Sequence, residues 1–110
     1  MDRGLVLLGR IETVLREGLE GTLGRAFAIG GCRASGYGAL AEARDRGAVA
    51  VILPRHELAD LDPGAASVLA LGISCASCDV LVAYQGRLSQ LPDASPARLV
   101  SVILGSPGSS

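Results

Sequence analysis

The stretch Ala26–Pro54, AFAIGGCRASGYGALAEARDRGAVAVILP, constrains the fold more than any other part of this sequence. It begins with an apolar run over Ala26–Ile29 that two glycines end, which is typical of a short strand buried on both faces. A predicted helix opens at Ser35-Gly36 and ends at Gly47, where a glycine can adopt positive φ. A second apolar run, Ala48–Leu53, predicts another strand. This order of elements predicts a βαβ unit with two parallel strands.

Helical and strand patterns also precede this unit. Leu5–Leu8 predicts a first buried strand, closed by Gly9. A helix should begin near Ile11, and residues 21–24 should form a loop. Two sets of apolar residues are expected to mark buried helix faces: Ile11, Val14, Leu15 and Leu19 in the first helix, and Tyr37, Leu40 and Ala43 in the second.

The second half of the chain gives weaker signals. We expect a polar loop over residues 55–62, two helical turns over Ala65–Leu71, a buried strand over Val80–Ala83, a weakly helical connection over Leu88–Pro96 and a last strand over Leu99–Leu104. The final residues, Gly105–Ser110, read as a disordered tail.

This alternation of strands and helices predicts an α/β fold: a Rossmann-like open, mostly parallel sheet with helices on both faces. Residues 1–104 should form a single domain, with 105–110 as the tail. Ligands bind such sheets outside the carboxyl ends of the strands. The loops Gly9–Thr13, Gly30–Gly36 and Tyr84–Leu88 are therefore expected together at one edge, where they would receive a small-molecule ligand.

Composition excludes several classes of protein. Nearly half of the 110 residues are apolar, at 49%, so a disordered chain is not expected. A formal net charge of −1 without a basic block argues against a nucleic-acid partner. No run reaches the roughly 18 apolar residues that cross a bilayer, so we expect no membrane partner and a cytoplasmic location.

The cysteines raise a separate hypothesis. Cys75 and Cys78 have the CxxC spacing of a redox pair or half of a zinc site. Redox activity requires a thiol pKa lowered by a helix N-terminus, whereas this pair precedes a predicted strand. Zinc requires two further ligands, and only Cys32 and His56 are available. Ordinary thiols and no metal are the preferred interpretation, with a thiol redox module as the weaker alternative. For His56, a solvated loop residue is preferred over a general base.

Three segments resemble one enzyme family. The segment CRASGYGALAEARDRG, with its following strand and LPRHELADLD, is similar to the second quarter of phosphoribosylglycinamide formyltransferases. DVLVAYQGRLSQLP resembles their strand and folate-contacting loop, and PARLVSV resembles the strand that leads to their catalytic His-Pro. The resemblance implies the N-terminal half of that fold. It also implies transfer of a formyl group from 10-formyltetrahydrofolate, as co-substrate and without a metal, to glycinamide ribonucleotide in purine biosynthesis.

The resemblance also implies positions for the site. Substrate binding falls on residues that follow the first strand: Gly9, Arg10, Ile11, Glu12 and Thr13. Folate binding falls on residues that follow the strand near position 80: Tyr84, Gly86, Arg87 and Leu88. Ser101 and Ile103 stand at the positions of the catalytic Asn and His, so no catalytic residue is intact. Isoleucine neither donates a hydrogen bond nor carries a proton, so the chain should be inactive in formyl transfer.

Other family positions differ as well. Cys32 and Arg33 replace Ser-Asn, and Leu61 replaces a folate-contacting arginine. A frameshift near Val102 or a truncation would explain the altered ending. Two functions remain open: an inactive formyltransferase-like domain, or a non-catalytic Rossmann-like nucleotide-binding or structural module. The last predicted strand, Leu99–Leu104, would leave an exposed sheet edge, which predicts a homodimer.

Overall fold

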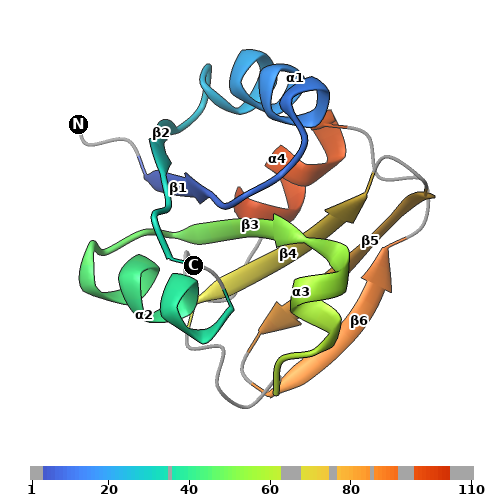
Figure 1. The fold of residues 1–110 in the computed structure, drawn as a ribbon. Helices are drawn as coiled ribbons and strands as arrows, with labels where there is room; N and C mark the ends of the chain where they lie inside the picture. The colour runs from blue at the N-terminus through green and yellow to red at the C-terminus, as the bar shows by residue number, and fades with distance from the viewer. Residues whose placement is uncertain are drawn as a thin grey trace.

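A computed structural model of the chain describes residues 4–34, 36–62, 68–74, 77–84, 86–91 and 96–104. Strands and helices alternate through the first half, and two antiparallel strands precede the last helix (Figure 1). In chain order the elements are β1 (Leu5–Leu8), α1 (Thr13–Leu23), β2 (Ala28–Gly31), α2 (Tyr37–Asp45), β3 (Ala50–Pro54), α3 (Arg55–Ala59), β4 (Leu69–Ser74), β5 (Ser77–Tyr84), β6 (Arg87–Leu91) and α4 (Pro96–Leu104).

The described strands form one mixed sheet in the order β2-β1-β3-β4-β5-β6. Strands β1 to β4 are parallel, whereas β5 is antiparallel to β4 and β6 is antiparallel to β5. The predicted α/β class with a mostly parallel sheet is confirmed. The expected βαβ unit is present, but its strands β2 and β3 lie on opposite sides of β1 instead of side by side.

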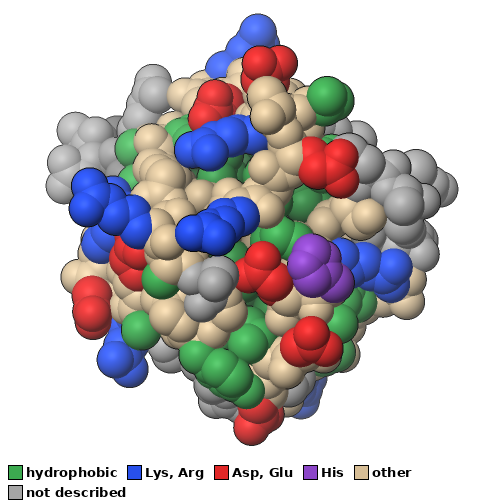
Figure 2. Space-filling model, viewed as in Figure 1, with side chains coloured by type: hydrophobic (Ala, Val, Ile, Leu, Met, Phe, Trp, Pro, Cys, Tyr) green, Lys and Arg blue, Asp and Glu red, His purple; other side chains and the backbone are tan. Residues whose placement is uncertain are grey.

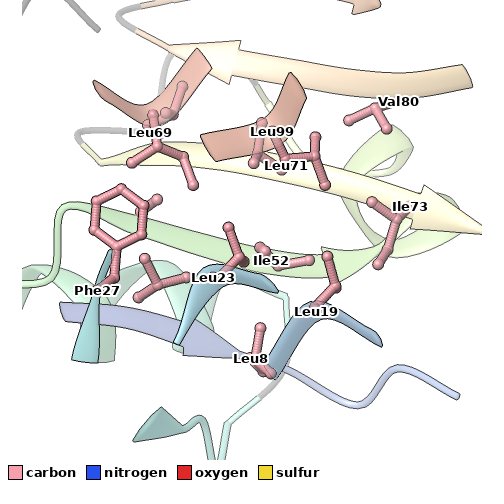
Figure 3. Packing of buried hydrophobic residues seen from close by; sticks show 13 residues of the cluster. Leu8, Leu19, Leu23, Phe27, Ile52, Leu69, Leu71, Ile73, Val80 and Leu99 are labelled. Atoms are coloured by element: carbon pink, nitrogen blue, oxygen red, sulfur yellow. The ribbon is translucent and has the colours of Figure 1, made fainter. Parts of the chain in front are cut away.

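Alternating side chains of the strands pack against helices on both faces of the sheet. On one face, Leu8, Ile52 and Leu71 lie in a cluster with residues of α1 and α4 (Figure 3). On the other face, Leu7 and Val51 lie in a cluster with residues of α2 and α3. Because neighbouring residues of a strand point to opposite faces, this sheet buries nearly continuous apolar runs.

The N-terminal half follows the sequence prediction with local differences. The helix α1 continues to Leu23, although a loop was expected over residues 21–24. Gly47 has a φ of 69°, as expected for a glycine that ends a helix. Val14 and Tyr37 were expected on buried helix faces, but they are 77% and 53% exposed. Both occupy the first turn of their helix.

The prediction that the strand near residue 26 is buried on both faces is wrong. The strand β2 instead covers Ala28–Gly31, and both of these terminal residues are exposed. It pairs with β1 alone and so forms one edge of the sheet. The apolar run resembled a central strand because an apolar pattern does not report how many neighbours a strand has.

The structure overturns four predictions in the second half. The helix α3 (Arg55–Ala59) replaces the start of the expected loop, and β4 replaces the end of the helix expected over Ala65–Leu71. The strand β6 replaces the start of the weakly helical connection. The last predicted strand is the helix α4, in which Leu99 and Ile103, four residues apart, are both buried.

This last correction removes the basis for the predicted homodimer, because Leu99–Leu104 belongs to a helix and forms no sheet edge. The expected tail, residues 105–110, lies outside the described residues. None of the helices in the described ranges is long and apolar enough to cross a membrane.

Candidate functional site

A pocket of about 420 Å³ opens where strands β1, β3 and β4 reach their carboxyl ends. Its walls come from the loop after β1, the first turn of α1, the junction of β3 with α3, the end of β4, and β5. The described lining residues are Arg10, Ile11, Glu12, Leu15, Pro54, Arg55, His56, Ala59, Ile73, Ser74 and Leu81.

The sheet order explains this position. From β1 the chain passes through α1 to β2 on one side, then through α2 to β3 on the other side of β1. The loops that leave β1 and β3 therefore diverge toward opposite faces of the sheet and leave a crevice between them. Such a switch point is where open α/β sheets bind ligands.

Gly9 allows the two strands to meet closely at the bottom of this crevice. Its backbone N–H donates a 2.7 Å hydrogen bond to the carbonyl oxygen of Ile52. A Cβ atom at Gly9 would lie 2.8 Å from Leu53 Cδ2 and 3.2 Å from the Ile52 oxygen. A side chain at this position would require the Leu53 side chain to move and would press on the Ile52 carbonyl oxygen, so glycine suits this close approach of the two strands.

The pocket combines an apolar interior with charged groups at its rim. Pro54 and Ile73 are buried, and Ile11, Leu15 and Leu81 are half-buried. Arg10, Glu12 and His56 are exposed, and Arg55 is half-buried. Figure 2 shows the histidine beside a basic side chain, with acidic side chains nearby. Few polar groups around an apolar interior are typical of small-molecule sites.

Arg55 differs from the other charged lining residues in being half-buried. Its Nε atom is buried and has no hydrogen-bond partner among the residues that the structure describes. A Cβ atom added to Gly72 would lie 3.2 Å from Arg55 Cα, so the backbone of Arg55 rests directly on β4. The start of this side chain is therefore held in place by the sheet.

Part of the sequence-predicted substrate segment lies at this pocket. Arg10, Ile11 and Glu12 line it, whereas Gly9 and Thr13 flank the lining residues in sequence. Arg55 and Ala59 of α3 and the residues at the end of β4 were missed, and His56 was weighed only as a general base. Arg55 and His56 directly follow a predicted strand, which was a usable signal, but Ser74 was hidden by the wrong helix prediction.

The predicted folate segment lies at the other end of the strands from the pocket, beside the start of β4. Because β5 is antiparallel to β4, Ala83 pairs with Ala70 near the start of β4. Tyr84 pairs with Arg87 across a tight hairpin, so Gly86 and Leu88 also lie at this end of the strands. The expectation that Tyr84–Leu88 meets the loops after β1 and β2 is therefore wrong.

The two positions aligned with catalytic residues lie on α4. Ser101 is exposed, and Ile103 is 2% exposed within the cluster that α1 and α4 share. Neither residue lines the pocket. The structure therefore places the Ile103 side chain in the core.

A second polar cluster surrounds Glu42 on α2. Its Oε1 atom accepts hydrogen bonds from the backbone N–H groups of Arg33 at 3.1 Å and Ala34 at 3.3 Å. The Cys32 thiol donates to the same oxygen at 3.5 Å, and Arg46 Nη1 lies 3.1 Å from Oε2. These bonds tie the end of β2 to α2.

The cluster shifts two pKa values in opposite directions. Burial, followed by the hydrogen bond to Glu42 and its negative charge, raises the pKa of the Cys32 thiol. Partial desolvation alone would raise the pKa of Glu42, but the hydrogen bonds from Ala34, Arg46, Arg33 and Cys32 outweigh it and lower that pKa. Cys32 is therefore held as an unreactive thiol. The cluster serves to fasten β2 to α2.

Within the described ranges, no group of three or more His, Cys, Asp or Glu residues is placed to hold a metal ion. Cys75 lies outside these ranges, and the side chain of Cys78 is not described. The CxxC hypothesis thus stays a prediction.

Comparisons with known proteins assign this chain to no family. The sequence matches no protein-family model, and no curated protein and no solved structure is significantly similar to it.

Proposed function

We propose that this chain is a non-catalytic, Rossmann-like module that binds a small molecule, with the cytoplasm as its expected location. The pocket at the switch point between β1 and β3 carries the proposal. Its volume of about 420 Å³ suits a small organic ligand, and its residues come from several elements of one sheet. A site supported by strands and helices is positioned before the ligand arrives, which favours binding.

The lining favours binding over catalysis. His56 is the one histidine of the chain and the lining residue whose type most often serves as a general base, and it is exposed. Among the described residues, no hydrogen bond orients its ring. General-base catalysis requires a base held within hydrogen-bond reach of its substrate. We therefore assign His56 to the rim of a binding site.

Formyl transfer is the less well supported alternative. It rests on the sequence resemblance and requires folate and substrate segments that meet. The segments carried over by the resemblance, Gly9–Thr13 and Tyr84–Leu88, lie at opposite ends of the strands. An assay of formyl transfer from 10-formyltetrahydrofolate to glycinamide ribonucleotide tests it directly, and turnover at a rate typical of enzymes would contradict our proposal.

Ligand binding is tested by NMR on the full chain. A set of small fragments is added to the ¹⁵N-labelled protein, and we expect some members to shift the backbone amide signals of Ile11, His56 and Ser74. Ala59 lines the pocket and is exposed, so Ala59→Trp should block it without filling the core. Ala41→Trp, on the exposed side of α2, is the matched control.

The two variants separate pocket binding from surface association. The fragments should fail to shift these amides in Ala59→Trp and should act normally on Ala41→Trp. The proposal is overturned if no fragment shifts these amides in the wild-type chain, or if Ala59→Trp binds the fragments as well as the wild type does.

A further inference from the structure

The geometry points to an organic anion as the ligand of this pocket: a phosphate or carboxylate group held by Arg55 beside Arg10 and His56, attached to an apolar body. This inference rests on the proposed function and narrows the class of molecule that the pocket accepts.

The buried Nε of Arg55 is the first observation. Buried polar groups in folded proteins nearly always have a hydrogen-bond partner, so a buried N–H without one requires an explanation. This atom belongs to a side chain that lines the pocket. Nε is closed to solvent, so an anion in the pocket would accept its hydrogen bond only after a turn of the Arg55 guanidinium that exposes this N–H. Guanidinium groups bind carboxylates and phosphates through two parallel N–H donors, and Nε–H commonly supplies one of them.

Charge is the second observation. Among the described lining residues, Arg10 and Arg55 stand beside a single carboxylate, Glu12. The described lining therefore carries net positive charge, although the whole chain has a net charge of −1. A local positive excess in an apolar recess attracts anions and disfavours cations.

The apolar interior is the third observation. Ile11, Leu15 and Ile73 offer hydrocarbon surface below the charged rim. An inorganic anion would leave this surface uncovered. An aromatic or aliphatic body joined to the anionic group would cover it, and the volume of about 420 Å³ leaves room for both parts.

Four single-ring probes test this inference by calorimetry and amide shifts on the full chain: phenyl phosphate, benzoate, phenol and benzylamine. All four share a benzene ring and differ in the charged or polar group attached to it. We expect at least one of the two anions to bind about tenfold or more tightly than phenol, because a tenfold difference is about 1.4 kcal/mol, no more than one charge-assisted hydrogen bond contributes. Benzylamine should bind most weakly. A preference between the two anions identifies phosphate or carboxylate as the preferred group.

Three variants test the role of Arg55. Arg55→Gln should weaken binding of the preferred anion about tenfold or more, and Arg55→Lys should recover only part of it, since lysine lacks the planar fork. Arg44→Gln changes the net charge equally but lies on α2, outside the pocket, and should bind normally. Circular dichroism confirms that each variant is folded.

The outcomes separate this inference from the proposed function. If phenol or benzylamine binds the wild type as tightly as the anions do, the inference is overturned and the binding module stands. The same holds if a folded Arg55→Gln binds the anions unchanged. If neither these probes nor the wider fragment set shifts the pocket amides, both proposals are overturned.

Discussion

The backbone N–H of Arg33 donates a 3.1 Å hydrogen bond to Glu42 Oε1. This contact joins the loop after β2 to the middle of α2, nine residues later in the chain. The same carboxylate accepts from the N–H of Ala34 and lies against Arg46. Arg46 in turn donates to the carbonyl oxygen of Gly31 at the end of β2. One side chain thus organises the edge of the sheet, although it lies outside the pocket.

We expect Glu42→Gln to destabilise the protein in a pH-dependent way. The hydrogen bonds to Glu42 lower its pKa in the folded state below the ordinary value of 4.5. Its stabilising contribution is therefore complete above the unfolded-state pKa and is lost as the pH falls through the lower, folded-state pKa. Urea unfolding at neutral pH should show the variant to be less stable than the wild type. The difference should shrink as the pH falls below 4.5 and through the lower, folded-state pKa of Glu42.

Glu17→Gln is the control for this experiment, since Glu17 is an exposed residue of α1. Its effect should stay within about 0.5 kcal/mol at every pH, as for most surface substitutions. A stability difference for Glu42→Gln that grew at acidic pH would contradict the assignment.

Cys32 should react slowly with thiol reagents in the folded protein. Burial and the neighbouring Glu42 raise its pKa, and only the thiolate is nucleophilic. A chain with Cys75→Ser and Cys78→Ser isolates this thiol, and the rate of labelling by iodoacetamide near pH 8 measures it. Adding Glu42→Gln removes the negative charge beside the sulfur, so the pKa should fall and labelling should accelerate. Labelling of the folded chain at the rate of the urea-unfolded chain would contradict this prediction.

Two Gly→Ala substitutions should have effects of opposite sign. A Cβ atom would meet no other group at either Gly18 or Gly47, so neither change creates a clash. Gly18 lies inside α1, where alanine raises the free energy of unfolding by roughly 0.5–1 kcal/mol. Gly47 has a φ of 69°, where alanine costs about 1–2 kcal/mol.

Thermal and urea unfolding measure both effects. Gly47→Asn should cost less than Gly47→Ala, because asparagine tolerates the left-handed conformation better. Equal and small effects for Gly18→Ala and Gly47→Ala would show that backbone conformation does not decide the outcome at these positions.

The sequence was most informative where one signal had one interpretation. Leu5–Leu8 was predicted with the bounds that the structure shows, and Gly47 ended its helix as expected. Ligands bind open α/β sheets outside the carboxyl ends of the strands, and this rule also led to the pocket, because Arg10 to Glu12 follow the first strand. It did not predict which strands were parallel. Because β5 is antiparallel to β4, Tyr84 lies at the other end of the strands from the pocket.

The failures came from short apolar runs. Periodicity does not distinguish a buried strand from a buried helical segment over so few residues. LALGIS contains good helix formers but pairs with β3, and Gly72 lets α3 approach it closely. LVSVIL is β-branched but forms most of α4, and Pro96 at the first helical position was the overlooked signal. Here tertiary packing outweighed intrinsic propensity.

The fold of α4 leads to a final prediction about Ile103, the position that the resemblance aligns with a catalytic histidine. Its side chain is 2% exposed in the cluster that includes Leu19 and Leu99. Ile103→His would place an imidazole in this apolar cluster and remove the apolar burial. We expect it to lower the free energy of unfolding by more than about 2 kcal/mol and to produce no formyl transfer.

Ser101→His, on the exposed side of the same helix, should change the free energy of unfolding by less than about 1 kcal/mol. Unfolding in urea compares the two variants, and the loss for Ile103→His should be larger at acidic pH, where a buried histidine must lose its charge or unfold the core. A stable Ile103→His chain that transfers formyl groups would instead place this position in a catalytic site. The formyltransferase relation would then regain its support, because an accessible imidazole at this position is what that chemistry requires.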